Sequence, residues 1–147
     1  MPDERRALTE RGERQARAAG AALAALEVRL DAVLTSPRVR ALETARLACE
    51  GWEDGPSPEI HEPLSAGFEG RQALELLAAW DVDAHVMLVG HEPDFSRLIA
   101  ELTGASVRLK KGGVARIDLA SASGGDLVVL ARPRELALMA RVAVGEV

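Results

Sequence analysis

Val86-Met87-Leu88-Val89-Gly90-His91-Glu92-Pro93 is an apolar run that stops at a glycine, a histidine and a proline. The four β-compatible residues predict a short strand, and apolar positions with helical spacing predict a helix that begins at Pro93 and ends before Gly104. His91 would then lie at the carboxyl end of a strand, beside a helix N-terminus whose free N–H groups favour an anion. Phosphate is the first ligand to consider, and a turn histidine without a function is an equal alternative from this stretch alone.

Strands and helices alternate along the rest of the chain. Thr9 is a candidate N-cap for an alanine-rich amphipathic helix, and residues 30–35 read as a short strand. Ser36 suits the N-cap and Pro37 the first position of a second helix, which runs to about Glu50. Further on, the pattern predicts an extended piece at residues 59–60, a helix at about 72–80, strands at 114–119 and 127–130, and a helix from residue 133.

This alternation favours an α/β fold with a mostly parallel sheet and helices on both of its faces. A chain of 147 residues fits a single domain, here residues 1–147. The carboxyl ends of parallel strands meet at one edge of the sheet, where such folds have their crevice. Arg40 and His91, each just after a strand, are therefore expected to come together although they are far apart in the sequence.

Composition excludes several classes of protein. The net charge of −5 argues against a broad nucleic-acid surface, which needs a basic stripe. No apolar run is long enough to cross a membrane, and the first residues lack the apolar core of a signal peptide. Cys49 is the single cysteine, so no disulfide framework is expected and a reducing cytoplasm is the expected location. Its thiol is expected to be buried on the inner side of the helix that carries it.

Three stretches together resemble the successive motifs of the histidine phosphatase superfamily: Leu8-Thr9-Glu10-Arg11-Gly12, Ser36-Pro37-Arg38-Val39-Arg40-Ala41-Leu42-Glu43-Thr44-Ala45 and Val89-Gly90-His91-Glu92-Pro93. The nearest branch is that of the small SixA-like phosphohistidine phosphatases. Each stretch alone is a weak signal for the family. The resemblance becomes fairly specific because the second motif is followed by the third at this distance in the sequence. The resemblance implies a phosphoglycerate mutase-like fold with three α/β/α layers.

The resemblance also implies a phosphoryl-transfer enzyme, in which one histidine attacks phosphorus and water then hydrolyses the phosphohistidine. Two arginines and a second histidine surround the phosphoryl oxygens and stabilise charge in the transition state. Arg40 matches the arginine of the second motif, and His91 matches the second histidine. The implied substrate is a protein phosphorylated on histidine or a small phosphoester, and neither a cofactor nor a metal is implied.

The attacking histidine of this family is not found in the sequence. Family members begin with a strand that ends in Arg-His-Gly, and this chain has no such tripeptide. Residues 1–9 resemble the segment that follows it, so the first central strand is expected to be missing and the chain as written to be inactive. Two explanations compete. In the first, the start codon was assigned downstream or the chain was cut, and the natural protein is a complete phosphatase. In the second, this is a short protein that lost catalysis and binds a phosphate or a partner. The first is favoured because losing a central strand would expose backbone groups and apolar faces.

Ser36, Arg38 and Lys111 are further residues that could line the rim of the pocket. The simpler interpretations are a helix cap for Ser36, an exposed helix-start arginine for Arg38 and a solvated turn for Lys111. His61 is expected in a solvated loop and His85 at the entry to a strand, so neither is a predicted metal ligand. The general acid and the oligomeric state stay unassigned.

Overall fold

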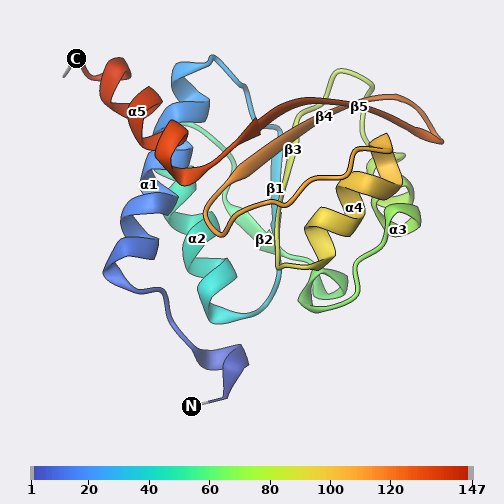
Figure 1. Ribbon diagram of the computed structural model, residues 1–147, viewed down its shortest axis with the longest axis horizontal. Coiled ribbons are helices and arrows are strands. Elements are labelled where there is room, and N and C mark those ends of the chain that lie inside the picture. Colours follow the sequence, from blue (N-terminus) through green and yellow to red (C-terminus); the bar gives the residue numbers. More distant parts are fainter. Residues whose placement is uncertain (1, 146–147) are drawn as a thin grey trace.

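The computed structural model describes residues 2–145 and has helices on both sides of a small central sheet (Figure 1). Its elements, with 3-10 helices written η, are η1 (Asp3–Arg5), α1 (Glu10–Ala25), β1 (Ala32–Thr35), α2 (Val39–Cys49), β2 (Pro58–Ile60), η2 (Glu62–Ser65), α3 (Gly70–Leu77), β3 (Val86–Val89), α4 (Asp94–Thr103), β4 (Val114–Ser121), β5 (Gly124–Ala131) and α5 (Pro133–Ala143). The predicted α/β class is confirmed. The predicted helices and strands are present, with ends that differ by a few residues, as is usual for element boundaries.

The central sheet has the strand order β2-β1-β3, and both pairs are parallel. β1 lies in the middle, and all four of its residues are buried. β3 is an edge strand, and its four residues are only half-buried. β4 and β5 pair with each other as a separate antiparallel sheet, so the parallel arrangement that the alternation predicts holds for the first three strands only.

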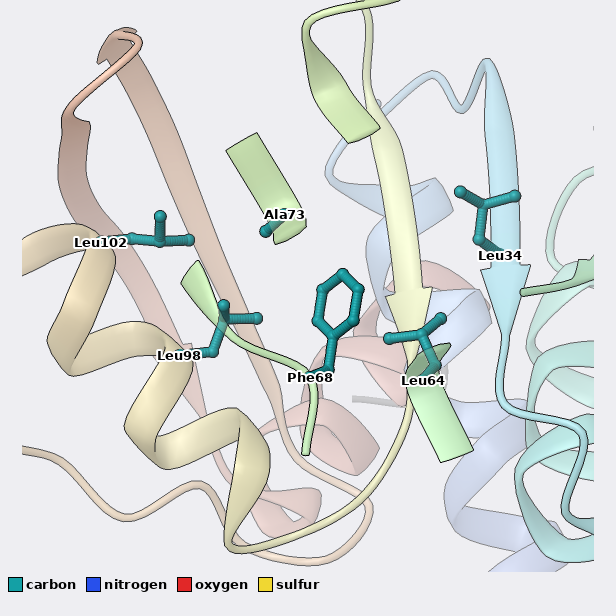
Figure 2. Close-up of a cluster of buried hydrophobic side chains, with 6 residues drawn as sticks. All are labelled: Leu34, Leu64, Phe68, Ala73, Leu98 and Leu102. Carbon is teal, nitrogen blue, oxygen red and sulfur yellow. The ribbon is translucent and has the colours of Figure 1, made fainter. Parts of the chain in front are cut away.

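Two helical layers enclose the strands. α1, α2 and α5 lie on one side and α3 and α4 on the other (Figure 1), which confirms the three-layer arrangement. The larger apolar cluster fills the α3 and α4 side (Figure 2) and consists of Leu34, Leu64, Phe68, Ala73, Leu98 and Leu102. A second cluster joins α1 to β5 and α5 and consists of Ala19, Ala22, Ala131 and Leu136.

Local signals set the helix ends as predicted in two cases. The side chain of Thr9 caps α1 by accepting a hydrogen bond from the Gly12 N–H at 3.0 Å. α4 ends at Gly104, which has a left-handed backbone with φ of 77°. Within residues 2–145, no helix is both long and apolar enough to span a bilayer.

α1 and α2 pack so closely that their backbones touch. A Cβ atom placed on Gly20 would lie 1.9 Å from the carbonyl oxygen of Ala48, well inside contact distance. The buried residues of both helices are all small, namely Ala16, Ala19, Gly20 and Ala22 in α1 and Ala41, Ala45 and Ala48 in α2. This contact fixes the position of α2, whose first turn carries Arg40.

Candidate functional site

The strands β1 and β3 end side by side, and the residues that follow them meet. Thr35 pairs with Val89, and the Ser36 N–H donates to the Val89 carbonyl at 2.9 Å. His91 follows two residues after Val89, and its ring Nε2 lies 2.7 Å from the Ser36 hydroxyl. The second and third motifs of the sequence are thus joined at the same edge of the sheet.

Ser36 connects His91 to the start of α2. It is fully buried, and its hydroxyl oxygen also accepts a hydrogen bond from the Arg38 N–H at 3.2 Å. The prediction that Ser36 is the N-cap of a helix starting at Pro37 is wrong by two residues, because Arg38 occupies the N-cap of α2 and the Ser36 bond closes a turn ahead of it. The hydroxyl therefore orders the turn and contacts the histidine ring.

Arg38 and Arg40 reach the same carboxylate. Asp3 Oδ2 accepts from Arg38 Nη1 at 2.9 Å and from Arg40 Nη2 at 3.1 Å, and the Asp3 carbonyl accepts from Arg40 Nη1 at 2.9 Å. The arginine side chains are only 22% and 25% exposed, so the expectation of an exposed Arg38 is wrong. The turn that Ser36 closes directs both guanidinium groups to one point, and that point attracts an anion.

Asp3 is a member of this site that sequence reasoning missed. Its carboxylate also pairs with Arg6 at 3.1 Å, so three arginines surround it. The hydrogen bond from Arg40 is the largest cause that holds the Asp3 pKa below its ordinary value. A single aspartate in a short polar segment gives no sequence signal for a site residue. Only its contacts with Arg38 and Arg40 identify Asp3 as part of the site.

His91 is neutral at physiological pH in this arrangement. Burial, as the largest cause, and the positive charges of Arg38 and Arg40 together lower its pKa from 6.5 to about 4, against the weaker opposing effects of Asp94 and Asp3. Which atom donates in the contact between His91 and Ser36 depends on the ring tautomer. Because the His91 ring is neutral, the positive charge of the site is carried by Arg38 and Arg40.

The free energy of unfolding is expected to fall as the pH drops from about 6.5 to about 4, in part because of His91. Over this range the unfolded chain binds a proton on His91 whereas the folded chain, with its lowered pKa, does not. After allowance for solvent screening of a half-exposed ring, the contribution is about 1–2 kcal/mol. Urea unfolding at several pH values would measure it, and His91→Gln should have a shallower pH dependence than the parent chain. An equal dependence in both proteins would contradict the assignment.

The N-terminus of α4 is occupied by the chain itself. The Glu92 carboxylate accepts from the Ser96 N–H at 2.8 Å and also contacts the Ser96 hydroxyl. Asp94 accepts from the Gly67 N–H at 2.7 Å. The expectation that free N–H groups of this helix favour an external anion beside His91 is therefore corrected, since the Glu92 carboxylate takes the Ser96 N–H and the His91 carbonyl takes the Phe95 N–H. The arginines of α2 provide the anion site instead.

The other predicted positions differ in how near they lie to this cluster, and the His61 N–H donates to the carbonyl of Thr35, the residue before Ser36, at 2.8 Å. Lys111 is exposed in the turn before β4, and the contacts that join Ser36, Arg38, Arg40 and His91 do not include it. His85 bonds the Arg29 carbonyl through Nδ1 at the opposite end of β3. His61 follows β2 at the same edge of the sheet as His91, and its ring packs edge-on against Phe68 with centroids 6.1 Å apart.

Two further observations concern metal and thiol chemistry. In the part of the chain that the structure describes, no group of three or more His, Cys, Asp or Glu side chains could hold a metal ion. Cys49 is half-buried rather than fully buried, and burial raises the pKa of its thiol. A thiol with a raised pKa is a poor nucleophile.

Solved structures with a similar fold are those of SixA proteins. The protein histidine phosphatase SixA complexed with tungstate matches with a TM-score of 0.83 and 24% identity, over 92% of this chain and 89% of that one. A candidate phosphohistidine phosphatase SixA from Nakamurella multipartitia matches with a TM-score of 0.76 and 24% identity, over 90% and 88% of the two chains. The corresponding protein from Agrobacterium tumefaciens matches with a TM-score of 0.75 and 21% identity, over 88% and 85%. At these identities the likeness establishes the fold.

Sequence comparison establishes the family. An uncharacterized protein of Picosynechococcus sp. (strain ATCC 27264 / PCC 7002 / PR-6) is 32% identical over 115 residues, which cover 74% of this chain and 69% of that protein. The profile of the histidine phosphatase superfamily (branch 1) matches residues 4–82, which include Ser36, Arg38 and Arg40 but end before His91. The chain therefore belongs to the histidine phosphatase superfamily, with a fold like that of SixA.

Proposed function

We propose that this protein is a phosphatase of the SixA type, which removes a phosphoryl group from phosphohistidine on a protein or from a small phosphoester. The observation that carries the proposal is the convergence of Arg38 and Arg40 on one carboxylate next to His91. A phosphoryl group is also an oxyanion, tetrahedral and with more acceptor oxygens than a carboxylate, and paired guanidinium groups can bind it. The likeness to SixA supports a phosphohistidine substrate.

The proposed reaction proceeds through a phosphohistidine intermediate. A histidine nitrogen attacks phosphorus, the bond from phosphorus to the leaving nitrogen or oxygen breaks, and water then cleaves the new P–N bond. Arg40 and Arg38 donate hydrogen bonds to the non-bridging oxygens and offset the charge that develops on them. In this proposal the attacking histidine is none of the three in this chain: His91 donates to the phosphoryl oxygens, His85 lies at the far end of β3, and the His61 ring packs against Phe68.

His91 changes its charge when the phosphoryl group binds. In the anion-free site the neighbouring arginines help to keep its pKa at about 4. A bound dianion offsets these positive charges and stabilises the protonated ring, so His91 can then donate to a phosphoryl oxygen. Ser36 holds the ring in position, and Lys111 contributes at most positive charge at the rim.

A binding protein without catalysis is the second candidate function. It is favoured by one observation, which is that the His91 ring bonds Ser36, whereas the His61 ring packs on Phe68 and the His85 ring bonds the Arg29 carbonyl. Such a protein would capture a phosphorylated partner or a small phosphoester on the same two arginines. Both candidate functions require the anion site. Only the phosphatase also requires an attacking histidine.

Replacing Arg40 by alanine should weaken the binding of inorganic phosphate by about thirtyfold, equal to ~2 kcal/mol for the loss of charge-assisted hydrogen bonds. Isothermal titration calorimetry of the 147-residue chain at pH 7 would measure the dissociation constant. Arg46→Ala is the matched control, because Arg46 is exposed on the same helix. Equal losses in the two variants would indicate a general charge effect, and no phosphate binding by the parent chain would contradict both candidate functions.

A further inference from the structure

The segment before α1 places a negative charge inside the anion site. Asp3 belongs to η1, a single turn that has no buried residue, and its carboxylate bonds Arg38 and Arg40 at 2.9 Å and 3.1 Å. Its main-chain carbonyl takes a further donor of Arg40. A phosphoryl group cannot bind these guanidinium donors while Asp3 holds them.

The arginines are fixed more firmly than the aspartate. Arg38 and Arg40 are about three-quarters buried at the start of α2, where Ser36 and the sheet order the backbone. The Asp3 side chain is 46% exposed, and exposed ion pairs contribute little to stability because water and salt screen them. Exchange of Asp3 for another anion would therefore leave the arginine pair in place.

The carboxylate does not satisfy the site completely. The Nε atom of Arg38 is buried and has no hydrogen-bond partner among the described residues. Buried donors are normally paired, so an unpaired one next to an anion site marks room for a further acceptor. Asp3 divides its two oxygens among Arg6, Arg38 and Arg40, whereas a phosphoryl group has three non-bridging oxygens to offer.

We propose that Asp3 is a resident counter-ion that competes with the substrate's phosphoryl group for Arg38 and Arg40, so that η1 must move away before substrate binds. The proposal rests on the proposed function, since it concerns access to the same anion site. In this proposal η1 is an autoinhibitory segment. The Asp3 carboxylate keeps a monoanion or a weakly bound anion away from Arg38 and Arg40, and a phosphoryl dianion displaces it.

The test is the affinity of the full chain for inorganic phosphate, measured by calorimetry at pH 7. Asp3→Asn keeps the size of the side chain and removes its charge, and we expect it to bind phosphate about tenfold more tightly than the parent chain. Glu4→Gln is the matched control, because it removes one negative charge from the same exposed turn, and it should change the affinity by less than twofold. Circular dichroism would confirm that each variant is folded.

A second pair of variants locates the effect. In an Arg38→Gln background the gain from Asp3→Asn should shrink to less than about threefold, because the carboxylate then has one arginine fewer to withhold. Weaker phosphate binding by Asp3→Asn would overturn the proposal and make Asp3 a positioning residue for the arginines. An unchanged affinity would overturn it while leaving the proposed function intact, whereas no phosphate binding by either protein would overturn the proposed function itself.

Discussion

A chain extended upstream in its reading frame, so that it carries an Arg-His-Gly strand, is expected to hydrolyse an aryl phosphate about 10⁶-fold faster than the 147-residue chain. Removal of the nucleophile from a covalent mechanism costs about this much, and charge stabilisation and binding alone leave an acceleration of about 10³–10⁴-fold over water. Under the proposed function, Arg38, Arg40 and His91 hold the phosphoryl group, and the histidine of that tripeptide attacks it. Initial rates with p-nitrophenyl phosphate would measure the difference.

The control is the same extended chain with the histidine of that tripeptide changed to alanine, which should fall back to the rate of the 147-residue chain. Acid quenching should also trap a phosphohistidine in the extended chain only. Two outcomes would contradict the assignment. Turnover by the 147-residue chain that is lost on Arg40→Ala or His91→Ala would mean that a nucleophile is present. An upstream frame without Arg-His-Gly would favour the binding protein.

Gly20→Ala is expected to lower the free energy of unfolding by about 3 kcal/mol, or the Tm by about 10 °C for a domain of this size. The added Cβ would lie 1.9 Å from the Ala48 carbonyl oxygen and 2.7 Å from its carbon. Both atoms are backbone, so no change of rotamer relieves the overlap and α1 must move away from α2. The movement would also loosen the support of the turn that carries Arg38 and Arg40.

Gly12→Ala on the same helix provides the control. There the nearest atom to an added Cβ is the end of the Leu8 side chain at 3.0 Å, which can move aside. Alanine has the better helix propensity, so Gly12→Ala should leave the stability unchanged or raise it by up to about 1 kcal/mol. Thermal unfolding followed by circular dichroism would compare the two variants. A Gly20→Ala protein that melts within about 2 °C of the parent chain would contradict the close helix contact.

The amino-acid sequence by itself determined the secondary structure and the location of the site. Short apolar runs predicted β1 and β3, and caps such as Thr9 and Gly104 predicted helix ends, because these signals act between residues close in the chain. It was also predictable that the turns before Arg40 and His91 lie at one edge of the sheet, since parallel strands direct the residues that follow them to one edge.

Tertiary structure alone decided what surrounds those residues. Burial of Arg38 and the entry of Asp3 into the arginine pair depend on contacts between segments that are distant in sequence, which no local pattern encodes. Glu92 takes the Ser96 N–H at the start of α4. The anion site beside His91 therefore rests on Arg38 and Arg40 and not on the N-terminus of α4. β4 and β5 form a sheet separate from the parallel one. Composition and periodicity predict strands, but they do not predict which strands pair with each other.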